Sequence, residues 1–145
     1  EPLVYTEDYG DEIGKAIIAH KGNDVTVVAC GCTGAFAVSA ANALEKEGIG
    51  VRVLDMHTVR PLDKQAIRDA IKDTGKIITA EDAFVINGLG SAVSDLMADE
   101  GLQAKFKRLG IPNDEFPPLG DSYELYAHLG YDPEGIKKAI REILE

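Results

Sequence analysis

Short apolar runs rich in β-branched residues alternate along this chain with longer stretches whose apolar residues recur every three or four positions. Four such runs predict buried strands: Val25–Ala29 and residues 51–54, 76–80 and 104–109. Three intervening stretches predict helices: residues 35 to about 47, the segment between Asp63 and Gly75, and Leu89–Glu100. Strands and helices that alternate in this way are typical of a parallel sheet covered on both faces, so a three-layer α/β fold is expected.

The two ends of the chain are less regular. Residues 82–88 are expected to form a loop, and the prolines after residue 111 predict irregular structure before two final helices. Ser122 opens the first of these helices, and Asp132 with Pro133 opens the second. Residues 14–20 fit either a short strand or the end of a helix. We expect one domain over residues 1–145, with residues 1–13 as an extended lead-in.

Charge and cysteine content narrow the classes of function. The chain has 15 basic and 25 acidic residues, a net charge of −10, which argues against nucleic acid as a partner. No apolar stretch reaches the roughly 20 residues of a membrane span, and no leader sequence is visible, so a cytoplasmic location is expected. Cys30 and Cys32 are too close in sequence to link distant segments, and free thiols are the simplest interpretation.

An ordered series of motifs resembles the C-terminal domain of transketolase. The series comprises residues 24–31, residues 43–63 with their Pro-Leu-Asp turn, Gly88-Leu89-Gly90-Ser91-Ala92-Val93, Leu109-Gly110-Ile111-Pro112 and Leu129-Gly130-Tyr131. The resemblance covers residues 10 to 145. It implies a five-stranded mixed sheet, with four parallel strands and an antiparallel edge strand at about residues 15–20. Ala83-Phe84 depart from the family, which often has a His there, and Asn87 stands where many members have Gly.

The same resemblance implies a role. In such enzymes thiamine diphosphate and magnesium are held by two other domains, which bind the diphosphate and the pyrimidine ring. The chain has no Gly-Asp-Gly motif with a metal-binding Asn and no separate pyrimidine domain. We therefore expect a C-terminal structural and assembly domain that binds no cofactor and is inactive alone. Its parent would transfer a two-carbon ketol unit between sugar phosphates, as a homodimer or heterotetramer that includes the missing domains.

Several alternatives stay open. Leu109-Gly110-Ile111-Pro112 and residues 132–136 also suit the C-terminal domain of deoxyxylulose-phosphate synthase, whereas Asp55-Met56-His57-Thr58 favours transketolase. The beta subunit of a 2-oxoacid dehydrogenase is a third choice. A stand-alone regulatory module that binds an anion or nucleotide is an alternative of another class. An excised fragment is favoured over a natural short protein.

Two loops are candidates for an anion site, because each follows a strand and opens a helix. Helix N-termini present free backbone N–H groups, and glycine allows a close approach. With the family's sheet order, the two loops flank the point where crossovers diverge, which is where open α/β sheets usually bind ligands. The candidate residues are Thr33, Gly34, Asn87, Gly88 and Ser91. Tight turns with helix capping are the alternative explanation.

The remaining polar and aromatic candidates concern interfaces. His57 and Arg60, in the turn before Pro61, and Tyr123 and Tyr126, near the C-terminus, are candidates for contact with a partner domain. Hydrogen bonds within the loop, or a local apolar cluster, would explain the same residues. Cys32 is expected to be a structural thiol. No catalytic residue and no metal ligand is assigned.

Overall fold

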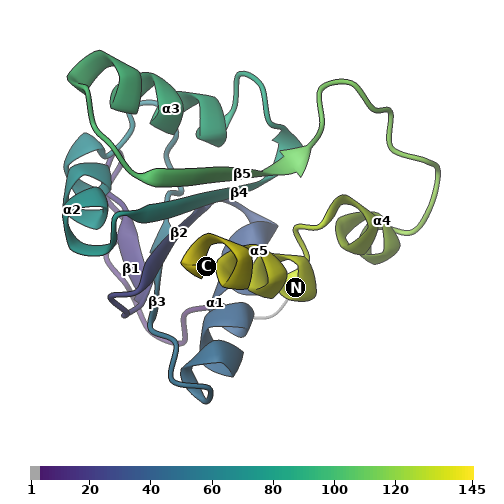
Figure 1. Cartoon of the computed structure of the whole chain (residues 1–145), viewed down its shortest axis with the longest axis horizontal. Helices are drawn as coiled ribbons and strands as arrows, with labels where there is room; N and C mark the ends of the chain where they lie inside the picture. Colours follow the sequence, from purple (N-terminus) through teal and green to yellow (C-terminus); the bar gives the residue numbers. More distant parts are fainter. Residues whose placement is uncertain (1–3) are drawn as a thin grey trace.

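The sheet of the computed structural model, which describes residues 4–145, has five strands in the order β1-β3-β2-β4-β5 (Figure 1). The strands are β1 (Ile17–His20), β2 (Val25–Ala29), β3 (Val51–Asp55), β4 (Lys76–Phe84) and β5 (Lys105–Ile111). Only β1 runs antiparallel to its neighbour, and it lies at one edge against β3. The predicted mixed sheet with an antiparallel edge strand is therefore confirmed, and residues 17–20 of the undecided segment form a strand.

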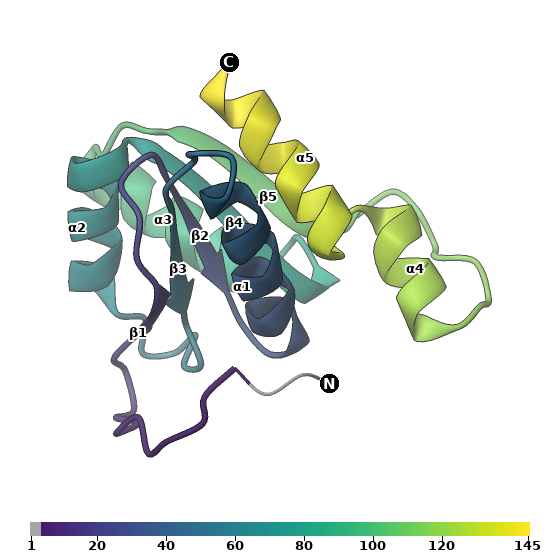
Figure 2. The same cartoon turned by 90° about the horizontal axis from the view of Figure 1, so that it is seen from below.

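Helices cover both faces of the sheet, which gives the three layers expected from the sequence (Figure 2). One face is covered by α1 (Cys32–Glu45) and α5 (Pro133–Leu144), and the other by α2 (Lys64–Thr74) and α3 (Leu89–Glu100). The short helix α4 (Ser122–Leu129) stands apart from these layers. Within residues 4–145, no helix has the length and apolar character needed to cross a membrane.

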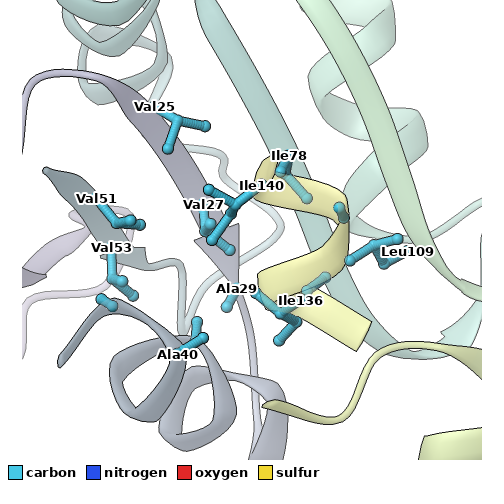
Figure 3. Close-up of a cluster of buried hydrophobic side chains, with 14 of the residues drawn as sticks. Val25, Val27, Ala29, Ala40, Val51, Val53, Ile78, Leu109, Ile136 and Ile140 are labelled. Carbon is cyan, nitrogen blue, oxygen red and sulfur yellow. The ribbon is translucent and has the colours of Figure 1, made fainter. Parts of the chain in front are cut away.

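The central strand β2 explains why the two apolar clusters form. All five of its residues are buried, and successive side chains point to opposite faces of the sheet. Val25, Val27 and Ala29 therefore join the cluster under α1 and α5 (Figure 3). Val28 joins the cluster under α2 and α3. Burial of one valine contributes about 1.5–3 kcal/mol, so this strand anchors both layers.

Local sequence signals set most helix ends. Asp63 caps α2 by accepting a hydrogen bond from Ala66 N at 3.1 Å, and its other carboxylate oxygen accepts from Ala16 N at 2.9 Å. Burial acts to raise the pKa of Asp63, but these hydrogen bonds act against it, and the pKa lies below its ordinary value. Asp132 caps α5 through Gly135 N at 2.8 Å, as the sequence predicts. The cap of α4 is Asp121, one residue before the predicted opening residue.

Three predicted boundaries are wrong by a few residues. β4 continues to Phe84, so the loop predicted from residue 82 begins after the strand. Phe84 pairs with Ile111 after a register shift that follows Ala80, and this pairing also extends β5 beyond residue 109. α1 spans residues 32–45 in place of 35 to about 47. The last three residues of β4 are exposed, and the extension of β5 consists of Gly110 and the half-buried Ile111, so no buried apolar run marks either extension in the sequence.

Candidate functional site

The carboxyl ends of β2 and β4 bring the two candidate loops together. The strands are parallel neighbours, with Val28 opposite Thr79 and Ala29 opposite Ala80. The chain leaves β2 through α1 on one face and leaves β4 through α3 on the other. The crossovers therefore diverge between these strands, as the family's sheet order implies, and this is the usual ligand position in open α/β sheets.

The start of α3 is occupied by a carboxylate from the chain itself. Glu81 is 2% exposed, and its carboxylate accepts hydrogen bonds from Leu89 N at 2.8 Å and from Gly90 N at 2.9 Å. A Cβ at Gly88 would collide with the Glu81 Oε2 atom. The glycine therefore makes room for the Glu81 carboxylate, which pairs the first two N–H groups of this helix.

The candidate residues at the start of α1 also make hydrogen bonds within the chain. Thr33 is fully buried, and its hydroxyl lies 2.8 Å from the Cys30 carbonyl oxygen and 2.7 Å from that of Ala80, which share its proton. The Gly34 N–H donates to the Gly31 carbonyl oxygen at 3.1 Å. Thr33 thus links the ends of β2 and β4, which is a structural role for a residue predicted to bind an anion.

Asn87 and Ser91 form a tight turn before α3. Asn87 N donates to Ser91 Oγ at 2.9 Å, and that hydroxyl donates to the Val85 carbonyl oxygen at 3.3 Å. Asn87 has a φ of 66°, in the left-handed region that asparagine tolerates better than most residues. These bonds agree with the alternative to an anion site, which is a tight turn that caps the helix.

Acidic groups dominate the electrostatics of this end of the sheet. Burial, together with the nearby charges of Glu81 and Asp55, raises the pKa of the Cys30 thiol to about 11. Asp82 accepts hydrogen bonds from Tyr131 Oη at 2.8 Å and Tyr126 Oη at 3.3 Å. A negative field opposes anion binding. The anion site at Thr33, Gly34, Asn87, Gly88 and Ser91 therefore stays a prediction, and the local charges weigh against it.

The candidate interface residues lie in two separate places. Arg60 lines a groove of about 400 Å³ between α2 and α3, and His57 Nδ1 lies 3.1 Å from Thr58 Oγ1. Tyr123 and Tyr126 pack near Phe36 of α1, on the opposite face of the sheet, with ring centroids 6.5 and 5.5 Å from that of Phe36. The structure pairs the two tyrosines with each other but does not bring them to Arg60.

Glu81 and Asp82 are the two residues of this site that the sequence analysis did not select. Their signal is an acidic pair directly after a buried strand and shortly before the Gly88-Leu89-Gly90 helix start. The polar atoms they contact lie 8 to 50 residues away in sequence, so their role appears only in three dimensions. Among residues 4–145, no three His, Cys, Asp or Glu side chains are grouped to hold a metal ion.

Comparison with known proteins places the chain in a family. The family model described as "Transketolase, C-terminal domain" matches residues 14–136. The chain is 39% identical over 145 residues to one subunit of the apulose-4-phosphate transketolase of Phocaeicola vulgatus, covering 99% of this chain and 46% of the relative. It is 43% identical over 133 residues to 1-deoxy-D-xylulose-5-phosphate synthase 1 of Geobacter sulfurreducens, covering 91% of this chain and 21% of that enzyme.

A solved structure extends the likeness to three dimensions. A chain described as a split-gene transketolase in an inactive beta4 tetramer superimposes with a TM-score of 0.87 at 33% identity. The match covers 99% of the present chain and 46% of the solved one. The present chain thus spans about half the length, or less, of the relatives that it matches.

Proposed function

The chain belongs to the family of transketolase C-terminal domains, and from this premise we propose that it acts as the structural and assembly domain of a transketolase-like enzyme. The observation that carries the proposal is the match of residues 14–136 to the family model. The fold supports it, because the strand order and the antiparallel edge strand agree with the family resemblance in the sequence. The parent enzyme would transfer a two-carbon ketol unit from a ketose phosphate to an aldose phosphate.

Thiamine diphosphate and magnesium would be bound by the rest of the parent enzyme. The residues of this chain do not form a binding site that suits thiamine diphosphate and magnesium. The Leu89 and Gly90 N–H groups at the start of α3 donate to Glu81, and the nearby charges are acidic. The part of the chain described holds no suitable group of metal ligands. A diphosphate would meet repulsion here without a compensating cation. We therefore assign no catalytic step to this chain.

The partners would be the diphosphate- and pyrimidine-binding domains, in a cytoplasmic homodimer or heterotetramer. The similarity to a protein named as one subunit of a transketolase supports an assembly of more than one domain. His57, Arg60, Tyr123 and Tyr126 remain the candidate contact residues. A role in the pentose phosphate pathway is the metabolic setting that we propose for the parent.

One alternative is favoured by a specific observation. The 43% identity to the Geobacter sulfurreducens synthase supports a C-terminal domain of a deoxyxylulose-phosphate synthase. The match to the Phocaeicola vulgatus transketolase covers more of the chain, 99% against 91%. The beta subunit of a 2-oxoacid dehydrogenase remains a third possibility for the parent. The stand-alone anion-binding module is disfavoured by the acidic charges at the carboxyl ends of β2 and β4.

Calorimetric titration of the purified chain separates these classes of function. Thiamine diphosphate with Mg²⁺ should give no saturable heat up to about 1 mM. A Kd of that size corresponds to a binding free energy of only about 4 kcal/mol. Inorganic phosphate and ATP should behave in the same way. Stoichiometric binding of the cofactor, with turnover of sugar phosphates, would overturn the proposal. Micromolar binding of phosphate or ATP alone would favour the regulatory module.

A further inference from the structure

An arm of the chain, defined here as residues 112–129, extends beyond the layers that cover the sheet. It consists of the loop after β5 and helix α4, and both views show it standing away from the main body (Figures 1 and 2). None of the eight residues of α4 is buried. The arm is attached chiefly by Tyr126, through its hydrogen bond to Asp82 and its ring contact with Phe36.

The tip of the arm exposes large apolar side chains. Phe116 is 95% exposed and Leu119 is 103% exposed, and Tyr123 on the following helix is 59% exposed. A single exposed apolar residue is ordinary, but several on one protruding segment are typical of a surface that a partner covers. Burying a phenylalanine and a leucine would contribute about 1.5–3 kcal/mol each.

The charges around these side chains indicate the chemistry of the partner. The carboxylates of Asp114, Glu115 and Glu124 are exposed, and these side chains make no hydrogen bond or ion pair to other residues in the range 4–145. No Lys or Arg occurs between Arg108 and Lys137. A second copy of this arm would bring like charges together, which disfavours self-association through it. A basic surface would be attracted.

We infer that the arm is a docking surface for a basic amphipathic segment of another polypeptide, with Phe116 and Leu119 as its apolar anchors. The arm is suited to the apolar face of a helix flanked by Lys or Arg, a common mode of recognition. The inference rests on the proposed function for the existence of a partner polypeptide, and it adds the surface and the chemistry of the contact. Arg60 and His57 play no part in it.

A synthetic peptide tests the chemistry directly. The probe is a helical peptide of about 18 residues, with leucines at helical spacing on one face and lysines on either side of them. It is titrated into the 145-residue chain, and its affinity is measured by fluorescence anisotropy at several salt concentrations. We expect saturable one-to-one binding that weakens as salt rises. A peptide with Glu in place of Lys should not bind.

Matched variants locate the contact. The double variant F116S/L119S keeps the net charge and should weaken binding at least about tenfold, a loss of about 1.4 kcal/mol. I13S is its control, because Ile13 is 81% exposed outside the arm. D114N/E115Q should weaken binding about three- to fivefold, whereas D95N/D99N makes the same change in charge on exposed positions of α3 and should have no effect. Circular dichroism verifies that each variant is folded.

Several results would overturn the inference. These are absence of peptide binding, equal binding by F116S/L119S, equal effects of the two charge variants, or equal affinity for the Glu peptide. Light scattering that shows a dimer abolished by F116S/L119S would identify a second copy of the chain as the occupant instead. The cofactor titration does not involve the arm. A chain that binds thiamine diphosphate and also binds the peptide through the arm would contradict only the proposed function.

Discussion

The buried carboxylate of Glu81 accepts a hydrogen bond from the backbone N–H of Leu89 at 2.8 Å, eight residues further along the chain. A second bond, from Gly90 N, gives the start of α3 two bonds to one side chain of β4. The negative charge also interacts favourably with the positive end of the helix dipole. Glu81 thus fixes the position of α3 relative to the sheet and fills the place where an external anion would bind.

Replacement of Glu81 should destabilise the fold. Glu81→Ala leaves two N–H groups buried without acceptors, and we expect a loss of about 3 kcal/mol in the free energy of unfolding. Glu81→Gln keeps one acceptor oxygen and should lose about half as much. Urea denaturation followed by circular dichroism measures both. Asp95→Ala, at an exposed position on the same helix, should change the free energy by less than about 0.5 kcal/mol. If Glu81→Ala were as stable as Asp95→Ala, Glu81 would not be needed to hold α3 in place.

Two glycine substitutions should have opposite effects. A Cβ at Gly88 displaces the Glu81 carboxylate, so Gly88→Ala should cost about 2–3 kcal/mol of stability. A Cβ at Gly34 in the first turn of α1 meets no atom within 4 Å, so Gly34→Ala should be neutral or stabilising by about 0.5 kcal/mol. Thermal melts compare the two variants. Equal melting temperatures would mean that the space beside Glu81 is not needed.

Much of the fold could be predicted because its strands and helices carry strong periodic patterns. Val25–Ala29 is apolar throughout and is buried throughout, and α5 shows one apolar face with an Asp-Pro start. The extension of β4 to Phe84 could not be predicted, because its last three residues are exposed. The order of the strands came from the family resemblance, since a pattern along the chain does not specify which strands are neighbours.

The candidate site was predicted less well than the fold. The sequence placed the two loops at one end of the sheet, which the pairing of β2 with β4 confirms. Thr33 was selected as a residue near a helix start, but its hydroxyl links two strand ends. Glu81 was not selected, because the capping residues of a helix are usually adjacent in sequence, whereas this carboxylate comes from the preceding strand.

The hydrogen bond from Tyr131 to Asp82 should make stability depend on alkaline pH. Burial, followed by this bond and the carboxylate charge, raises the pKa of Tyr131 above its ordinary value of 10.0. The folded state therefore favours the neutral phenol, whose contribution is complete below pH 10. That contribution declines as pH rises above 10, because the unfolded chain then ionises first.

The Tyr131→Phe variant tests this dependence. It should lose about 1 kcal/mol at neutral pH, because the bond to a partly solvated carboxylate is lost. Its stability should also decline less steeply than that of the parent above pH 10. Tyr123→Phe is the control, since Tyr123 is 59% exposed. Parallel stability curves for the parent and Tyr131→Phe above pH 10 would contradict the expected coupling.

Cys30 should react slowly with alkylating reagents. Its pKa of about 11, against an ordinary 9.0, reduces the thiolate population at pH 8 about hundredfold. The greater nucleophilicity of a more basic thiolate recovers about tenfold, so a net reduction of about tenfold is expected before access is considered. Iodoacetamide labelling of the Cys32→Ser variant, followed by mass spectrometry, isolates this thiol. A rate that levels off below pH 9 would be inconsistent with the buried acidic surroundings.

The most direct test of the assembly role is a domain exchange. The 145 residues replace the matching region of the related apulose-4-phosphate transketolase polypeptide from Phocaeicola vulgatus, and the transketolase activity of the complete enzyme is measured. We predict kcat/KM within about tenfold of the parent, a loss below about 1.4 kcal/mol, because this region supplies structure and no catalytic group. A hybrid that folds and assembles but has no transketolase activity would contradict the claim.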